Sequence, residues 1–284
     1  MKIGEREFDS CGHTYVMGIL NVTPDSFSDG GKWNGLDSAL GRVEVMVEEG
    51  ADVIDIGGES TRPGYIMISA AQEMERVLPV VEAVKSRFDV PVSLDTCKAE
   101  VALAGIAAGV DLINDIWGLK FDDKIAGVIA ESGLPCCLMH NRRDAEYRNF
   151  MQELAGDLAE TLHLAKVAGI EGDRIILDPG VGFAKNYEQN LEVINCLEEL
   201  KALGCPLLLG CSRKSVVGLT LGLPVEERLE GTLATTVLAV IKGCMFVRVH
   251  DIKENVRAIK MTEAVLKAHL SSTLHSGCEC MRNT

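Results

Sequence analysis

Short apolar runs recur along the chain. Each is followed by polar or turn residues and then by a segment whose apolar positions are three and four residues apart. The apolar runs predict buried strands, and the spacing of three and four predicts amphipathic helices. Nearly continuous apolar strands that alternate with helices indicate a parallel sheet covered by helices. The predicted strands span residues 15–21, 53–58, 91–96, 112–116, 135–140, 174–180, 206–212 and 245–251.

Eight strand–helix units are the number found in a (β/α)8 barrel. A doubly wound open sheet has the same periodicity, so the positions of the polar residues must decide between the two folds. In a barrel all strands end at one mouth, whereas the outer strands of an open sheet end far from its switch point. Polar residues lie at or just past the ends of the predicted strands: Asn21, Glu59, Asp95, Asn114, His140, Asp178, Ser212, Arg248 and His250. We therefore predict a single (β/α)8 TIM barrel, an α/β fold with its active site at the C-terminal ends of the strands.

The prediction divides the chain into three segments. Residues 15–270 form the barrel, and residues 1–14 lie across its bottom or pair as a small hairpin. The composition SSTLHSGCECMRNT at positions 271–284 predicts a disordered tail. Ser69 and Gln72 have the spacing of a capping box, which predicts the start of a helix.

Composition narrows the class of protein. With 284 residues, 47% of them hydrophobic, the chain can bury one large core without a second domain. It has neither a long uninterrupted apolar run nor an apolar signal core at its start, so we expect a soluble cytoplasmic protein. Most of the ten cysteines fall in apolar runs, where we expect free thiols. A formal charge of −14 argues against nucleic-acid binding and means that an anionic substrate needs a local cluster of cations.

A polar loop follows the first predicted strand, in the sequence MGILNVTPDSFSDGG at positions 17–31. Asn21 stands where the strand reaches the surface, and Thr23, Pro24 and Phe27 follow it. A connecting turn has no reason to expose a lone aromatic residue. Phe27 therefore indicates a functional loop that moves.

Cations gather at one side of the predicted mouth. Thr61 and Arg62 follow the second strand. Arg248 and His250 end the eighth strand, which neighbours the first strand in a closed barrel. Guanidinium groups pair with phosphate oxygens, and an amide oxygen such as that of Asn21 can bind Mg²⁺ together with a substrate phosphate. Arg62 alone would be read as a solvent-exposed cation, but a charge such as Arg248 inside a buried strand needs a partner. Together these residues predict a diphosphate site with Mg²⁺.

Acidic and amide side chains gather at the opposite side. Asp95, Asn114 and Asp178 end the third, fourth and sixth predicted strands. A carboxylate can accept two parallel hydrogen bonds from a flat edge of N–H and NH2 groups, and an amide can donate and accept beside it. These groups complement a guanidine-like heterocycle such as a pterin. A metal site, or carboxylates that accept from backbone amides at the mouth, would use the same residues equally well.

The segment LLLGCSRKSVVG predicts a helix that begins near Ser215, directly after the seventh strand. The free N–H groups at its start, with Lys214 beside them, can receive a carboxylate, and a helix cap at Ser215 is compatible with this role. Phe183, flanked by glycines, is predicted at a loop tip that covers an aromatic substrate. Met139 is predicted as an apolar wall, either of the site or of the core.

Other familiar sites are missing from the sequence. No glycine fingerprint follows the first strand, and there is no nucleophile elbow or serine triad. His275, Cys278 and Cys280 near the end of the chain form only an isolated group of possible metal ligands.

In chain order, eight segments resemble the pattern of the dihydropteroate synthases over about residues 15–266: NVTPDSFSDGG, ESTRPG, PVSLDT, INDI, MH, DPGVGF, SRKS and RVHD. The resemblance is specific because each match falls at the end of a predicted strand. It implies a transferase that condenses 6-hydroxymethyl-7,8-dihydropterin diphosphate with 4-aminobenzoate. The products would be 7,8-dihydropteroate and diphosphate, in folate synthesis. It further implies Mg²⁺ as cofactor and a homodimer formed through helices in the C-terminal half.

The resemblance assigns roles to the matching residues. Those implied for the pterin are Asp95, Asn114, Met139, Asp178 and Lys214. Those implied for the diphosphate are Asn21, Thr61, Arg62, Arg248 and His250, with Asn21 as the metal ligand. Those implied for 4-aminobenzoate are Thr23, Pro24, Phe27, Pro63, Phe183, Lys214 and Ser215. Catalysis would fall to Arg62, Lys214, Arg248 and His250. Ala184 departs from the pattern, which usually has glycine there, and we expect only a local change near the aminobenzoate pocket.

Two other functions fit part of this pattern. A pterin-binding methyltransferase shares the barrel and the pocket of two aspartates and an asparagine, but it would not need NVTPDSFSDGG or the pair Arg62 and Arg248. A catalytically silent barrel would only bind a pterin or a partner, and the intact anion-site residues argue against it. Release of diphosphate from the two substrates would distinguish the synthase from the silent barrel, and a product formed with a methyl donor would identify the methyltransferase.

Overall fold

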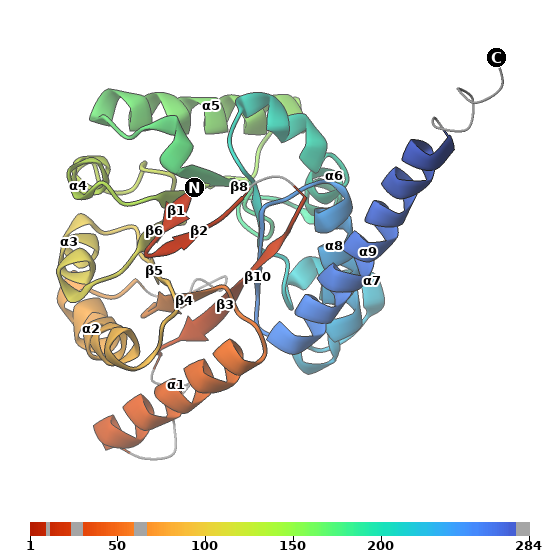
Figure 1. The fold of residues 1–284 in the computed structure, drawn as a ribbon. Helices are drawn as coiled ribbons and strands as arrows, with labels where there is room; N and C mark the ends of the chain where they lie inside the picture. The colour runs from red at the N-terminus through yellow and green to blue at the C-terminus, as the bar shows by residue number, and fades with distance from the viewer. Residues whose placement is uncertain (10–11, 24–30, 60–66, 277–284) are drawn as a thin grey trace.

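The computed structural model describes residues 1–9, 12–23, 31–59 and 67–276, and Figure 1 shows its strands inside an outer layer of helices. The inner strands are β3 (Tyr15–Asn21), β4 (Val53–Gly57), β5 (Val92–Asp95), β6 (Leu112–Asp115), β7 (Cys136–Met139), β8 (Ile175–Asp178), β9 (Leu208–Leu209) and β10 (Phe246–Val249). The helices are α1 (Gly31–Glu48), α2 (Ala70–Arg87), α3 (Ala99–Ala108), α4 (Ile125–Ser132), α5 (Phe150–Ala168), α6 (Tyr187–Asn195), α7 (Ser215–Leu221), α8 (Leu229–Ile241) and α9 (Ile252–Ser276).

The inner strands form one closed parallel sheet. Neighbouring strands within the described residues follow the order β8-β7-β6-β5-β4-β3-β10-β9. The two ends of this order meet, because Leu177 of β8 forms a parallel bridge with Leu207 just before β9. The N–H of Leu177 also donates to the carbonyl of Pro206 at 2.9 Å. The predicted (β/α)8 barrel is thus confirmed, and the open doubly wound sheet is excluded.

Side chains inside the barrel are apolar near the amino ends of the strands, here called the lower end, and become polar near their carboxyl ends. One buried cluster fills the lower end and includes Met17, Val53, Leu112, Cys137, Ile176, Leu208 and Phe246, one residue from each of seven strands. Because side chains alternate along a strand, the residue two positions further on faces the interior again. At those positions six of these strands carry Asp55, Asn114, Met139, Asp178, Gly210 and Arg248. The interior therefore becomes polar at the carboxyl ends of the strands.

Residues 1–9 lie against the apolar end of the barrel. β1 (Lys2–Ile3) and β2 (Arg6–Glu7) form an antiparallel hairpin. Ile3 and Phe8 are buried in the same cluster as Phe246, and the ring of Phe8 lies 5.5 Å from the ring of Phe246. The N-terminal hairpin therefore extends the apolar core below the barrel.

Two boundaries differ from those predicted. Only Leu208–Leu209 of the seventh predicted strand is extended in the ladder, because the chain turns after Cys211, whose carbonyl accepts from the N–H of Lys214 at 3.2 Å. At the end of the chain α9 continues to Ser276, so the first six residues of the segment that we expected to be disordered are helical. The remaining residues of that segment, with Cys278 and Cys280, lie outside the described residues.

Local signals in the sequence agree with the structure. The capping box at the start of α2 is present, with Ser69 and Gln72 bonded reciprocally. Every cysteine in the described part of the chain is a free thiol, as expected. A search of the same part of the chain for a helix long and apolar enough to cross a membrane finds none.

Candidate active site

The polar layer at the mouth is built around a buried carboxylate on β4. Asp55 is fully buried and accepts three hydrogen bonds. Its donors are the hydroxyl of Ser93 at 2.6 Å, the amide nitrogen of Asn114 at 3.2 Å and Nε of Arg248 at 2.6 Å. A buried charge is tolerated only when it is paired and hydrogen-bonded. Asp55 therefore connects strands β4, β5, β6 and β10 across the barrel interior.

Arg248 joins the two clusters that the sequence placed on opposite sides of the mouth. Besides Asp55, its guanidinium donates to Oδ2 of Asp95 at 2.6 Å. Burial opposes the charge on Arg248, but the two carboxylates outweigh it and hold the pKa of the guanidinium above its ordinary value. The expectation that Arg248 needs a charged partner is confirmed, and the partners are both carboxylates.

Asp95 holds its proton unusually tightly. Burial raises the pKa of Asp95 to about 7, and the negative charge of Asp55 adds to the rise against the opposing effect of Arg248. Two carboxylates that share one guanidinium cannot both be fully compensated. Near neutral pH, Asp95 is therefore poised to ionise when a ligand supplies further donors.

Asp178, Lys214 and Arg248 converge at Gly210 of the seventh unit. A methyl group added to Gly210 would lie 3.5 Å from Oδ2 of Asp178, 3.8 Å from Nζ of Lys214 and 3.9 Å from Cβ of Arg248. Burial raises the pKa of Asp178 and lowers the pKa of Lys214, while the attraction between the two opposes both shifts. The carboxylate of Asp178, the ammonium of Lys214 and the side chain of Arg248 therefore surround one point beside the backbone of Gly210.

Residues 179–184, here called the Phe183 loop, cover one side of this cluster. The ammonium of Lys214 lies 4.8 Å from the centre of the Phe183 ring, a cation–π contact, and donates to the carbonyl of Val181. Gly180, Gly182 and Ala184 all have positive φ, of +71°, +84° and +44°. Glycine is favoured in this conformation because it has no Cβ, so Ala184 adopts a backbone conformation in which its side chain is strained.

The structure places the remaining described candidates around the same mouth. Ser212 and His250 are joined at 3.0 Å through the hydroxyl and Nδ1, so the ends of units seven and eight are tied together. Asn21 ends β3 beside Gly57 and is exposed. Ser215 is the first residue of α7, as predicted. Met139 is buried at the end of β7, and Thr23 is half-buried just past β3.

Five of the candidate residues have no described position. Pro24, Phe27, Thr61, Arg62 and Pro63 lie outside the described residues. Their roles stay predictions, as do the roles of the residues whose positions are described above.

Sequence reasoning overlooked Asp55, although a signal for it was present. Asp55 interrupts the apolar run of β4 in the same way that Arg248 interrupts the run of β10. The argument that a charge in a buried strand needs a partner applies to both residues and would have predicted that Asp55 is paired, but not with which residue. Ser93, the hydroxyl donor to Asp55, carries no signal of its own because serine is common in strands and loops.

The fold and the mouth define an α/β-barrel enzyme. Its site combines carboxylates and an amide with a half-buried arginine and a lysine, and an aromatic loop lies beside them. Such a set of groups suits a polar heterocycle that carries an anionic substituent.

Comparison with known proteins gives the family. The sequence profile of the pterin binding enzymes matches residues 17–250. The dihydropteroate synthase of Clostridium beijerinckii is 58% identical over 268 residues, which cover 94% of this chain and 100% of that protein. The chain belongs to the pterin-binding enzyme family, and within it to the dihydropteroate synthases.

Two solved structures share the fold closely. A dihydropteroate synthase from Clostridium difficile, solved in the presence of pteroic acid, is 48% identical, with a TM-score of 0.89 over 91% of this chain and 99% of that one. The enzyme from Xanthomonas albilineans, solved with 4-aminobenzoic acid, is 40% identical, with a TM-score of 0.86 over 89% of this chain and 93% of that one.

The left-handed conformation of Ala184 gives a stability prediction. An alanine at positive φ costs about 1–2 kcal/mol, and glycine relieves this strain while losing part of the gain through a more flexible unfolded chain. We expect Ala184→Gly to raise the free energy of unfolding by roughly 0.5–1 kcal/mol in urea titrations. Ala159→Gly, the same change on an exposed turn of α5, should lower it by about 1 kcal/mol. A loss in both variants would contradict the strain at position 184.

The raised pKa of Asp95 gives a pH prediction. Because the folded state holds this proton up to about pH 7, it binds more protons than the unfolded chain between about pH 4 and 7. Asp95 therefore contributes stability below pH 4 that is lost as the pH rises through 7, by at most about 1.4 kcal/mol per pH unit. Urea titrations at pH 5 and 8 should show that wild type loses stability relative to Asp95→Asn. A difference that does not change with pH would show that Asp95 ionises normally.

Proposed function

We propose that this protein condenses 6-hydroxymethyl-7,8-dihydropterin diphosphate with 4-aminobenzoate to form 7,8-dihydropteroate and diphosphate in folate biosynthesis. The observation that carries the proposal is the convergence of Asp178, Lys214 and Arg248 around Gly210, beside Asp95 and next to the apolar cluster inside the barrel. The relatives named dihydropteroate synthase, one of them 58% identical, support the same activity.

The pterin ring binds in this proposal among the acidic and amide groups. The carboxylates of Asp95 and Asp178 accept from the guanidine-like edge of the ring, and Asn114 can donate or accept beside them. Met139 forms an apolar wall, and Lys214 donates to the ring from the opposite side. New donors from the pterin would stabilise the ionised form of Asp95, whose carboxylate already accepts from Arg248. When the ring binds, the carboxylate of Asp95 would thus accept hydrogen bonds from the pterin as well as from Arg248.

The diphosphate binds at the cationic side of the mouth, near Arg62, Arg248 and His250, with Thr61 beside them. Asn21 supplies an amide oxygen for Mg²⁺, which usually takes few protein ligands and completes its shell with water and substrate phosphate. The exposed position of Asn21 at the end of β3 fits such a shared ion. When bound, Mg²⁺ would neutralise charge on the leaving diphosphate.

The chemistry is a substitution at the methylene carbon of the pterin. The bond from this carbon to the diphosphate oxygen breaks, and the amine nitrogen of 4-aminobenzoate forms a bond to the same carbon and loses a proton to water. Arg62, Arg248 and His250 stabilise the charge that builds on the departing diphosphate. The aniline nitrogen is nucleophilic without a strong base, so holding it in line supplies much of the rate.

4-Aminobenzoate binds in this proposal against Phe183, between the first loop and the start of α7. Lys214 lies 4.8 Å from the Phe183 ring and is the N-cap residue of α7, so one cation serves both substrates. The carboxylate would be received by the N–H of Ser215 and its side chain. Thr23, Pro24, Phe27 and Pro63 complete the pocket and exclude water from the reacting carbon.

Replacement of Arg248 tests the proposal. We expect Arg248→Ala to lower kcat/KM for diphosphate release by about 10²-fold or more, because a fixed positive charge that stabilises the leaving group is lost. Arg248→Lys keeps the positive charge but loses the paired N–H donors of the guanidinium, so its kcat/KM should lie between those of wild type and Arg248→Ala. Release is measured with both substrates, with and without Mg²⁺. Arg174→Ala is the matched control, since Arg174 lies at the other end of a strand and donates to backbone carbonyls.

Two results would contradict the proposal. Wild-type protein that releases no diphosphate from the two substrates would favour a barrel that only binds. Equal turnover in Arg248→Ala and Arg174→Ala would remove Arg248 from the mechanism.

We further propose that the protein acts as a homodimer through α7, α8 and α9. α8 packs against both of the other helices, and Figure 1 shows the three at one side of the barrel. Large apolar side chains are exposed on them, among them Leu219, Leu238, Ile241, Met261 and Val265. Exposed apolar side chains on three neighbouring helices support an interaction site, and identical chains with two-fold symmetry are the commonest partners.

Charged substitutions test this surface. The double variant Leu219→Glu with Ile241→Glu should sediment as a monomer while wild type sediments as a dimer, because burying two unpaired carboxylates in the interface is unfavourable. Val167→Glu is the control, as Val167 is even more exposed, at 73%, but lies on α5. A dimer that survives the double substitution, or is lost in the control, would rule out this interface.

A further inference from the structure

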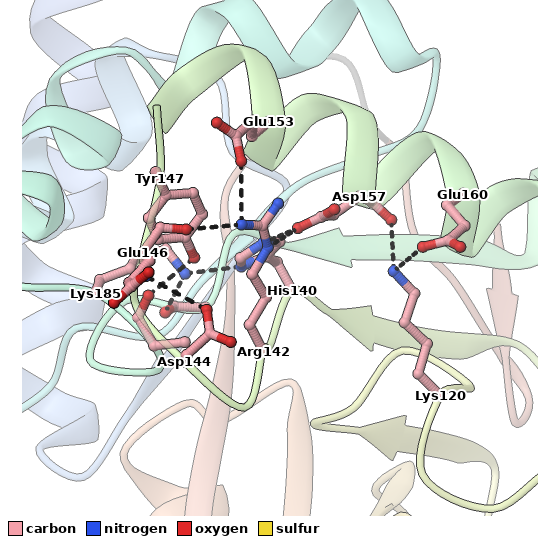
Figure 2. Close-up of polar contacts among 12 residues, drawn as sticks. Lys120, His140, Arg142, Asp144, Glu146, Tyr147, Glu153, Asp157, Glu160 and Lys185 are labelled. Atoms are coloured by element: carbon pink, nitrogen blue, oxygen red, sulfur yellow. Dashed lines mark hydrogen bonds and ion pairs between the residues drawn. The ribbon is translucent and has the colours of Figure 1, made fainter. Parts of the chain in front are cut away.

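A polar chain lies behind the Phe183 loop and takes no part in the mechanism above. Figure 2 shows that it runs from Lys185 through His140 and Asp157 to Arg142. Nζ of Lys185 lies 2.9 Å from Nδ1 of His140, and Nε2 of His140 lies 2.9 Å from Oδ2 of Asp157. Nε of Arg142 donates to the same oxygen of Asp157 at 2.5 Å. His140 is buried at the end of β7, so the chain crosses from the loop to α5 through the protein.

The protonation of this chain follows from its geometry. A lysine ammonium can only donate, so Nδ1 of His140 must accept and Nε2 must carry the proton that is donated to Asp157. Burial and the nearby charge of Lys185 lower the pKa of His140 to about 4, so its imidazole is neutral at physiological pH. A neutral imidazole with one fixed tautomer therefore links a cation to an anion.

Lys185 holds the Phe183 loop at both of its ends. Besides His140, its ammonium donates to the carbonyls of Gly180 and Phe183, both at 3.0 Å. All three of its protons are thus used. The loop also lies directly on the backbone of β7, since a methyl group on Gly180 would come within 2.0 Å of the carbonyl oxygen of His140. The position of Phe183 therefore depends on the ammonium of Lys185, which binds the loop backbone on the side away from the mouth.

The far end of the chain returns to the same loop. The guanidinium of Arg142 stacks 4.4 Å from the centre of the Tyr147 ring, and the hydroxyl of Tyr147 donates to the carbonyl of Ala184 at 2.9 Å. Carbonyls at positions 180, 183 and 184 are thus held by one connected network. Charge-assisted hydrogen bonds of this kind are stronger than neutral ones and fix geometry as well.

We propose that Lys185, oriented by His140 and Asp157, is a positioning residue that holds the Phe183 loop in the conformation that receives 4-aminobenzoate. The proposal rests on the proposed function, because it assigns Phe183 to the aminobenzoate pocket. Lys185 touches neither substrate in this proposal. It acts through the ring of Phe183 and through the carbonyl of Val181, which accepts from Lys214.

Charges around Lys185 add a dependence on pH. Burial lowers the pKa of Lys185 to about 7, Lys214 and Arg142 lower it further, and Asp178 and Asp157 oppose the shift. His140 faces the ammonium as a neutral group. As the pH rises above 7, Lys185 loses a donor to the loop, so the KM for 4-aminobenzoate should rise in wild type and stay unchanged in a variant without the amine.

Two matched lysines test the proposal. Lys185→Met removes the three donors and keeps the apolar stem. Lys120→Met makes the same change at a lysine that also contacts Asp157, donating to its carbonyl at 3.0 Å, but that has no contact with the Phe183 loop. We expect Lys185→Met to raise the KM for 4-aminobenzoate by about tenfold or more, the loss of a charge-assisted bond, with the KM for the pterin diphosphate within about twofold. Lys120→Met should change neither.

Hydrogen exchange provides a readout that does not depend on turnover. The backbone amides of residues 180–185 should exchange faster in Lys185→Met than in wild type or Lys120→Met, because the carbonyls of Gly180 and Phe183 lose their donor. If Lys185→Met fails to fold, Asp157→Asn should show the same selective rise in KM, since His140 then loses its fixed tautomer.

The outcomes separate this inference from the function on which it rests. Wild type that forms no dihydropteroate overturns the proposed function, and the exchange measurement still shows whether Lys185 orders the loop. An active wild type in which Lys185→Met raises the KM values of both substrates equally, or of neither, overturns the positioning role. Unchanged exchange in the loop overturns it as well.

Discussion

The ion pair between Asp55 and Arg248 is the constraint on which the mouth of this barrel depends. Both charges lie inside the barrel, directly above an apolar layer that cannot compensate either of them. Removing the charge of Arg248 would cost about 3–5 kcal/mol, because the fully buried carboxylate of Asp55 would be left without a counter-ion. Ser93, Asn114 and Asp95 are held in place by the same two groups. The hydrogen bonds and ion pairs of these two charges thus pre-organise the polar layer at the mouth.

The same ion pair explains why the acidic residues are responsive to a ligand. Arg248 is shared between Asp55 and Asp95, and Asp95 is left with a raised pKa. A ligand that brings new donors can therefore change the charge of the site at little cost. Lys214 is in a similar position, because burial lowers its pKa while Asp178 compensates its charge only in part. Groups with shifted pKa values in a cleft are typical of functional sites.

The Phe183 loop shows a second way of fixing a site. Three of its residues have left-handed backbone conformations, and Ala184 adopts one without the freedom of glycine. Such a loop is held only if its surroundings over-determine it. Lys185, Tyr147 and Asn190 supply the hydrogen bonds that do so. The buried polar chain behind the loop therefore supplies hydrogen bonds that compensate the backbone strain of the loop.

Much of this protein follows from its sequence alone. Apolar runs and helical spacing are local properties, so they determined the eight units. The polar residues at the strand ends favoured the barrel over an open sheet, and the motifs around them identified the family that the chain resembles. What each charge pairs with was decided by the tertiary structure. Arg248 reaches across the barrel to Asp55 and Asp95, and Lys185 meets His140 from 45 positions away. Partners of this kind depend on strand register and on directions inside a closed sheet, which no local pattern contains.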